Sequence, residues 1–252
     1  IRSHVDIDTD HGLTLFEGVA ATRDRYAEVM QIEIVAFPQS GMMSRPGTAE
    51  LMETALANGA EVVGGLDPCG IDRDPKGQLD AVFALAEKHG KPIDIHLHDG
   101  GVTGLAELTD IAERTAAAGL EGRVVVSHAF ALGGPEDIGP TVEALARAGV
   151  AILTHGPGTA TMPPVVRLWE AGVKVLAGND NIRDAWSPYG NGDLLKRAMM
   201  IGYRQAMNGD DELGLLFSII TERTAARMGF PPHGLEVGDA ADLVLIDAPG
   251  VT

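Results

Sequence analysis

Seven short apolar runs, rich in β-branched residues, recur along the chain and alternate with longer amphipathic stretches. The runs begin roughly 22–32 residues apart, which is the spacing of βα units. Most are apolar on both faces, as in strands of a parallel sheet that helices cover. We therefore predict strands over residues 1–7, 31–37, 61–66, 92–98, 123–129, 150–155 and 173–178. Helices are predicted between them, including 48–58, 77–89, 104–118 and 136–148, several of which close on glycine.

Seven such units without a change of pattern predict an α/β fold, namely a (β/α)8 TIM barrel in which one strand is missing. An open doubly wound sheet would carry G-x-G-x-x-G after an early strand, and none is there. Two helical segments, 193–207 and 211–228, follow the last strand, and Pro231-Pro232 then interrupts the pattern. We assign residues 1–230 to the barrel. Residues 231–252 are interpreted as the beginning of a small β-sandwich appendage, because 234–247 has the pattern of a turn and a strand.

Composition narrows the possible partners. The chain has 19 basic and 36 acidic residues, a net charge of -17, which disfavours nucleic acid and anionic membranes and favours a small neutral or cationic partner. The longest apolar runs are too short to cross a bilayer. One cysteine, Cys69, excludes an internal disulfide and indicates a reducing compartment, so a cytoplasmic location is expected. The chain opens on Ile1 inside a predicted strand, which suggests an N-terminal truncation.

Polar residues collect where the predicted strands end, and in a βα barrel these ends meet at one face. A single histidine in such a place is usually a hydrogen-bonded core residue. Five of the eight histidines in equivalent places favour a common site. The residues at the strand ends are His4, Asp6, Gln39, Asp67, His96, His98, Asp99, His128, His155, Asp180 and Asn181.

Imidazoles and carboxylates together are typical of a site for zinc or a similar divalent ion. His96 and Asp180 are candidate ligands, and Asp99 is a candidate proton carrier next to the first of them. Further ligands would come from the missing strand or from other strand-end histidines. A serine triad is disfavoured, because G-x-S-x-G is absent and Ser127 is predicted on the strand face opposite His128. Cys69 has no evident base.

The chain resembles the metal-dependent amidohydrolase superfamily, within it the branch of cytosine deaminase and N-isopropylammelide isopropylaminohydrolase. The most specific stretch is GNDNIRDAWSPYGNGDLL, which is closer to the isopropylammelide enzymes. Stretches that carry the resemblance extend over nearly the whole chain: residues 2–8, 34–41, 93–101, 122–132, 159–173, 178–195 and 237–247. The family's first strand ends in His-x-His, and the only such pattern here, His96-Leu97-His98, belongs to the family's fifth strand. The resemblance thus implies that strands two to eight are present.

The resemblance also implies roles. His96 and Asp180 would bind the metal, and Asp180 would also take a proton from the attacking water. His128 would hydrogen-bond that water or the substrate oxygen. Asp99 occupies the position at which cytosine deaminase has a glutamate that would carry the proton. Because the side chain of Asp99 is shorter, His98 is an alternative proton carrier. Gln39, Asn181 and Trp186 would contact the substrate.

Two differences from other family members bear on the substrate and on the number of metal ions. Asn181 replaces a second aspartate of the cytosine enzyme, which argues against cytosine and favours an exocyclic C–N bond of a triazine or related ring. The two-metal relatives end their fourth strand in a carboxylated lysine. Here that strand ends GGLDP, and Lys76 lies in the following helical region, so we expect one divalent ion, zinc or iron.

We therefore predict a metal-dependent hydrolase that removes ammonia or an amine from a nitrogen heterocycle of pyrimidine or triazine type, with a homo-oligomer possible. Two alternatives remain. One is a phosphate-handling barrel enzyme that uses the glycine-rich loop 155–161 as an anion site. The other is a metal-free amidohydrolase-like scaffold. Metal analysis distinguishes the scaffold from the hydrolase.

Overall fold

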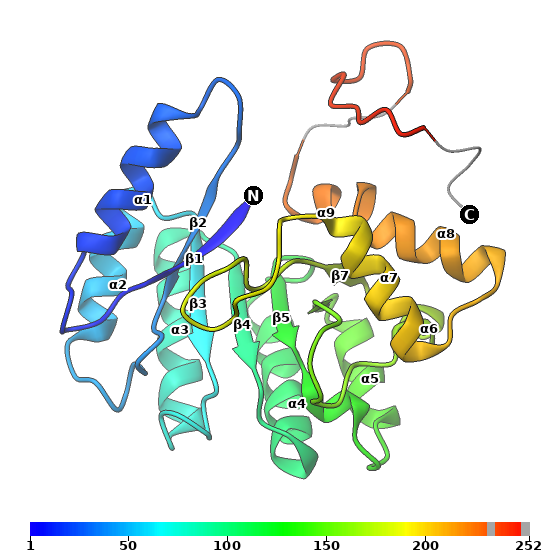
Figure 1. The fold of residues 1–252 in the computed structure, drawn as a ribbon. Helices are drawn as coiled ribbons and strands as arrows, with labels where there is room; N and C mark the ends of the chain where they lie inside the picture. The colour runs from blue at the N-terminus through cyan, green and yellow to red at the C-terminus, as the bar shows by residue number, and fades with distance from the viewer. Residues whose placement is uncertain (231–234, 248–252) are drawn as a thin grey trace.

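The computed structural model describes residues 1–230 and 235–247 and contains one curved, seven-stranded parallel sheet (Figure 1). The strands pair in chain order from β1 to β7. Each lies within a predicted run, so the α/β class and the seven parallel strands are confirmed. Their bounds are β1 Arg2–Asp6, β2 Glu33–Phe37, β3 Val62–Leu66, β4 Ile93–Leu97, β5 Val124–His128, β6 Ala151–Thr154 and β7 Val175–Ala177.

Helices cover the outer face of this sheet. Capping residues and glycines in the sequence explain where some of these helices begin and end. At the start of α3, Asp74 accepts a hydrogen bond from the Gly77 amide at 2.8 Å and Pro75 occupies the first turn. Gly90 ends that helix at φ +63°. The elements are α1 Thr14–Arg25, α2 Thr48–Ala57, α3 Pro75–His89, α4 Gly101–Ala117, η1 Phe130–Gly133, α5 Gly139–Arg147, α6 Val165–Glu170, α7 Leu194–Gln205, α8 Asp210–Ile219 and α9 Glu222–Arg227.

The elements observed in the C-terminal part of the chain differ from the predicted ones at two places. The predicted helix 211–228 is broken into α8 and α9 at Thr221, whose backbone leaves the helical region and whose hydroxyl bonds the Phe217 carbonyl at 2.8 Å. The predicted strand within 234–247 is not formed in residues 235–247, although a turn joins Glu236 and Asp239. Apolar side chains such as Leu245 are fully exposed there, so none of the described residues packs against this segment. The proposed boundary at Pro231-Pro232 lies outside the described residues.

The main core lies between the sheet and the helices, where strand residues such as Ile93 and Ile95 pack against Leu79 and Leu108. Alternation along each strand turns the intervening residues to the inner face of the sheet. On β4 these are Asp94 and His96. The inner face is therefore polar toward the carboxyl ends of the strands. Within residues 1–230 and 235–247, no helix is long and apolar enough to cross a membrane.

Candidate active site

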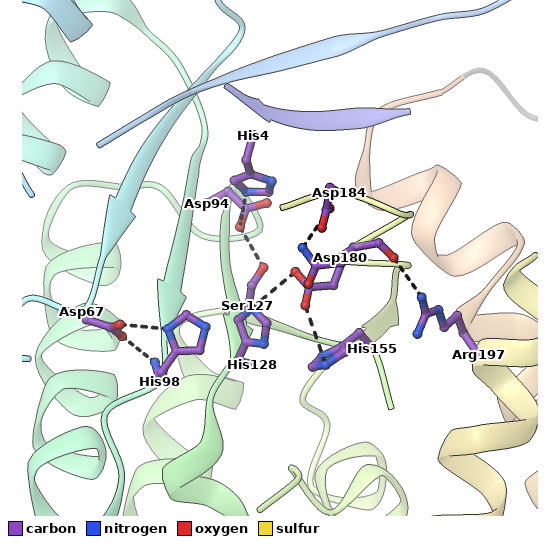
Figure 2. Close-up of polar contacts among 11 residues, drawn as sticks. His4, Asp67, Asp94, His98, Ser127, His128, His155, Asp180, Asp184 and Arg197 are labelled. Carbon is purple, nitrogen blue, oxygen red and sulfur yellow. Dashed lines mark hydrogen bonds and ion pairs between the residues drawn. The ribbon is translucent and has the colours of Figure 1, made fainter. Parts of the chain in front are cut away.

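Five histidines from four strands and the loops that follow them form a connected cluster on the inner face. The ring of His128 is the hub, with centroids 4.8 Å from His96, 4.3 Å from His98 and 5.0 Å from His155. His4 on β1 joins through His96, 4.4 Å away. Figure 2 shows how Asp180, which follows β7, points into the same space. The convergence expected from the strand ends is thus present in the structure.

Three members of this cluster could hold a metal ion. His96, His128 and Asp180 each offer one donor atom, and all three atoms lie within 4.8 Å of one another. Asp180 Oδ1 is 4.0 Å from His128 Nε2, and its Oδ2 is 3.7 Å from His155 Nε2. Nδ1 of His96 and Nδ1 of His128 are buried without a hydrogen-bond partner among the described residues. This set of a carboxylate and neutral nitrogens fits a divalent ion such as zinc or iron.

Electrostatics keeps these imidazoles neutral, the form that binds metals. Burial is the main reason that the pKa of His96 lies well below its usual value, and the positive charge of His4 or His128 would lower it further. Burial, with His98 and His155 nearby, lowers the pKa of His128 to about 2. Neither ring therefore needs to lose a proton before it binds a metal ion.

A second group, His4, Asp94 and His96, also has donor atoms within 4.8 Å of one another. Its carboxylate, however, is already paired with the guanidinium of Arg2. The Asp94 carboxylate is fully buried and accepts from Arg2 at 2.8 Å and from the Ser127 hydroxyl at 3.0 Å. Burial alone would raise the pKa of Asp94, yet His4 and Arg2 hold it well below its usual range. This network neutralises Asp94 internally and links it to His4 of the histidine cluster.

His98 is held by an aspartate to which the sequence analysis assigned no role. Asp67, directly after β3, bonds His98 twice: Oδ1 accepts the backbone amide at 2.5 Å and Oδ2 lies 2.8 Å from ring Nδ1 (Figure 2). The side chain of His98 is 39% exposed, so its other face is accessible to a ligand. Burial lowers the pKa of His98, but Asp67 and then Asp180 raise it by more, so the net shift is upward. His98 can therefore carry a proton.

Asp99, the other candidate proton carrier, has different neighbours. Its Oδ2 accepts the Gly70 amide at 2.9 Å, and its carboxyl group lies beside that of Glu107 on α4. These contacts direct the carboxylate toward the loop after β3, away from the donors on His96 and Asp180. His98, in contrast, has its ring beside that of His128, with the ring centroids 4.3 Å apart.

The residues expected to contact substrate lie around the rim. Gln39 follows β2 and is partly exposed. Asn181 donates to Asp184 Oδ2 at 3.0 Å, and Asp184 Oδ1 accepts the Trp186 amide at 3.0 Å. The Trp186 side chain is 73% exposed, so it does not pack in the core.

Arg197 on α7 fixes the segment that carries Asp180. Its Nε donates to Asn179 Oδ1 and its Nη2 to the Asn181 carbonyl, both at 3.1 Å. The residue is 8% exposed, and sequence reasoning missed it because α7 follows the strand by many residues. Arg197 therefore holds both neighbours of Asp180 in place.

Three residues at the site adopt left-handed backbone conformations that non-glycine residues rarely take. The φ angles are +37° at Asp67, +71° at His128 and +60° at Asp180. Strand alternation would turn His128 outward, because its neighbour Ser127 faces inward to Asp94. The left-handed turn brings the ring back into the cluster. Such strain gathers at functional sites, where the surrounding structure holds it.

The loop 155–161 does not suit a phosphate. Arg204 donates to the carbonyls of Gly156 at 2.6 Å and Ala160 at 2.5 Å. The loop thus directs carbonyl oxygens at a cation from its own chain, whereas an anion site needs free amides.

Comparison with known proteins identifies the family of the chain. The profile of the amidohydrolase family matches residues 7–252. The N-isopropylammelide isopropyl amidohydrolase of Pseudomonas sp. (strain ADP) is 34% identical over 98% of this chain and 62% of its own length. The crystal structure of N-isopropylammelide isopropylaminohydrolase from Burkholderia multivorans superposes with a TM-score of 0.95 and 43% identity, over 100% of this chain and 65% of that one. The structure of 5-methylcytosine deaminase from Klebsiella pneumoniae liganded with phosphonocytosine gives a TM-score of 0.89 and 28% identity, over 99% and 65%.

The chain therefore belongs to the amidohydrolase family. It is similar to relatives on the isopropylammelide and cytosine deaminase branch, as the sequence analysis predicted. The chain spans 62–65% of the length of these three relatives.

Proposed function

We propose that the protein is a metal-dependent hydrolase that removes ammonia or an alkylamine from a nitrogen heterocycle of pyrimidine or triazine type. The observation that carries the proposal is the meeting of donor atoms from His96, His128 and Asp180 within 4.8 Å, beside the oriented His98. Similarity to isopropylammelide hydrolases and to 5-methylcytosine deaminase supports the ring class of the substrate.

His96 and Asp180 would hold one divalent ion, zinc or iron. When bound, the ion supplies a Lewis acid that lowers the pKa of water and polarises the carbon under attack. Asp180 accepts the proton from the attacking water, because one of its oxygens remains available for that role. His128 hydrogen-bonds the water or the substrate oxygen.

His98 gives its own proton to the departing nitrogen, which leaves as ammonia or an amine, and the proton that Asp180 took from the water then restores His98 directly or through solvent. Its suitability rests on the bond from Asp67 to Nδ1, which fixes the tautomer and leaves Nε2 directed at the ligand. Asp99 is the weaker candidate for this step because its carboxylate is engaged with Gly70. Gln39, Asn181 and Trp186 surround the opening and would contact the edge and face of the ring.

The test uses the intact protein, purified with its metal and assayed against ammelide derivatives, cytosine and other aminated pyrimidines and triazines. We expect one zinc or iron ion per chain and release of ammonia or alkylamine from at least one of these rings. Absence of a bound metal would favour the metal-free scaffold. Stoichiometric metal with no turnover of any nitrogen heterocycle would overturn the proposed substrate class. We also propose a cytoplasmic enzyme that acts on small molecules.

A further inference from the structure

Two carboxyl groups hold the loop that presents Asp67. Residues 67–70 form this loop directly after β3, and we refer to it as the Asp67 loop. The Cys69 amide donates to Glu107 Oε1 at 2.8 Å, and the Gly70 amide donates to Asp99 Oδ2 at 2.9 Å. A side chain at Gly70 would bring its Cβ within 2.5 Å of the Asp99 carboxylate, so the glycine permits this close approach. The amides of Cys69 and Gly70 are thus satisfied by acidic side chains from the β4–α4 unit.

Glu107 is an unusual residue to find in this position. It belongs to the buried side of α4, which also carries the core residues Leu105, Leu108 and Ile111, and it is only 5% exposed. Its second oxygen, Oε2, is buried without a hydrogen-bond partner among the described residues. An ionised carboxylate in this state would carry a large desolvation cost. An exposed position on α4 would have avoided that cost, so the buried position of Glu107 implies a specific role in the core.

The charged and titratable groups that face Glu107 come from other elements. They are the carboxylates of Asp99 and Asp67 and the thiol of Cys69, all at the carboxyl ends of β3 and β4. Burial, and then the charge of Asp99, raise the pKa of Glu107 to about 8. At neutral pH the protonated form of Glu107 therefore predominates: its Oε1 accepts from Cys69, and its Oε2, which has no partner in the described part of the chain, lies on the side of the Asp99 carboxylate. A neutral acid and a carboxylate can lie side by side where two carboxylates would repel each other.

The Asp67 loop needs such support. Asp67 has a φ of +37°, which is unfavourable for a non-glycine residue, and it must align two oxygens with two nitrogens of His98. The bonds at Cys69 and Gly70 restrain the two positions that follow Pro68, so the backbone of Asp67 has little freedom to relax.

We propose that Glu107 and Asp99 act as a pair of positioning residues, which hold the Asp67 loop so that Asp67 keeps His98 in its working orientation. The inference rests on the role proposed above for His98. In this proposal Asp99 acts by holding the loop through its bond with the Gly70 amide, and it does not transfer the proton itself.

The test compares Glu107→Ala and Glu107→Gln in the intact, metal-loaded protein, with Glu113→Ala as a control at an exposed position of the same helix. Glu107→Ala should lower kcat roughly 10- to 100-fold, as is typical when an orienting partner is lost, with little change in KM or metal content. Glu107→Gln keeps an acceptor for Cys69 and a donor for Asp99, so it should restore most of kcat. Glu113→Ala should behave as wild type.

A spectroscopic measurement separates this inference from the proposed function. The proton between His98 Nδ1 and Asp67 should give a low-field NMR signal in protein labelled with 15N-histidine, assigned by its loss in His98→Gln. Glu107→Ala should shift or broaden that signal, and Glu107→Gln should retain it, whether or not a substrate has been found. An unchanged signal in folded Glu107→Ala overturns the positioning role even if wild-type turnover is confirmed.

Asp99→Asn distinguishes positioning from proton transfer, and it is informative if Glu107→Ala does not fold. The amide oxygen still accepts from Gly70, so kcat should fall much less than it does in His98→Gln. A loss in Asp99→Asn as large as that in His98→Gln would assign proton transfer to Asp99 and overturn the inference.

Discussion

Glu107→Gln should change how the stability of the protein depends on pH. The pKa of Glu107 is raised from 4.5 to about 8 in the folded state, first by burial and then by Asp99. The folded protein therefore holds this proton more tightly than the unfolded chain does. The stabilising contribution is full below pH 4.5 and is lost as the pH rises through about 8. Glutamine has no proton to lose, so its contribution stays constant over this range.

The size of the effect follows from the shift. Each pH unit of difference between the folded and unfolded pKa is worth ~1.4 kcal/mol, which sets a ceiling of about 5 kcal/mol for the whole range. The residue is 5% exposed, so solvent screening is weak, but relaxation of the loop reduces the loss. We expect the unfolding free energy of Glu107→Gln to gain on the order of 3 kcal/mol relative to wild type between pH 5 and pH 9.

The assay is equilibrium unfolding in urea at one-unit intervals from pH 5 to pH 9, on metal-depleted protein so that metal binding does not contribute. Glu113→Gln, at an exposed position of α4, controls for the general effect of removing a negative charge from this helix. Its stability should follow that of wild type at every pH. Parallel curves for wild type and Glu107→Gln would refute the argument, because they would mean that Glu107 is already ionised at pH 5.

Three further predictions concern the proposed mechanism. Asp180→Ala should lose both bound metal, measured by elemental analysis, and turnover; retention of full metal would remove Asp180 from the ligand set. His128→Ala should keep the metal but lower kcat by roughly 10²-fold or more, the usual contribution of a group that handles a proton or a developing charge, and metal loss would instead make His128 a ligand. Asp67→Asn should lower kcat roughly 10- to 100-fold with metal content unchanged; a change confined to KM would contradict its role in orienting His98.

The α/β fold was largely predictable because buried parallel strands produce a clear pattern of apolar runs in the sequence. All seven strands lie within the predicted runs, since strands covered by helices are apolar on both faces and recur with the length of a βα unit. The predicted and observed elements differ where this apolar pattern is weak. The α8–α9 break depends on one threonine, and the predicted strand in 234–247 has the composition of a strand but nothing to pair with in the described part of the chain.

Much of the site could also be anticipated, because a barrel brings its strand ends together whatever their separation in the chain. His96, His98, His128 and Asp180 were all chosen on that ground, and the structure brings them to one face. The bond between Asp67 and His98 was not foreseeable in the same way. It depends on a left-handed backbone at Asp67, which leaves no signature in residue spacing.

The sequence by itself determined which residues gather at the carboxyl edge of the sheet, because the period of a βα unit and the direction of parallel strands are encoded locally. Only the tertiary structure decided what each of them does there. Glu107 has the sequence context of any acidic residue on an amphipathic helix, and Asp99 that of a proton carrier beside a histidine. When α4 packs against the loop after β3, Glu107 becomes buried and Asp99 accepts a hydrogen bond from that loop. Burial and proximity set the chemistry of both carboxyl groups, and both depend on three-dimensional contacts.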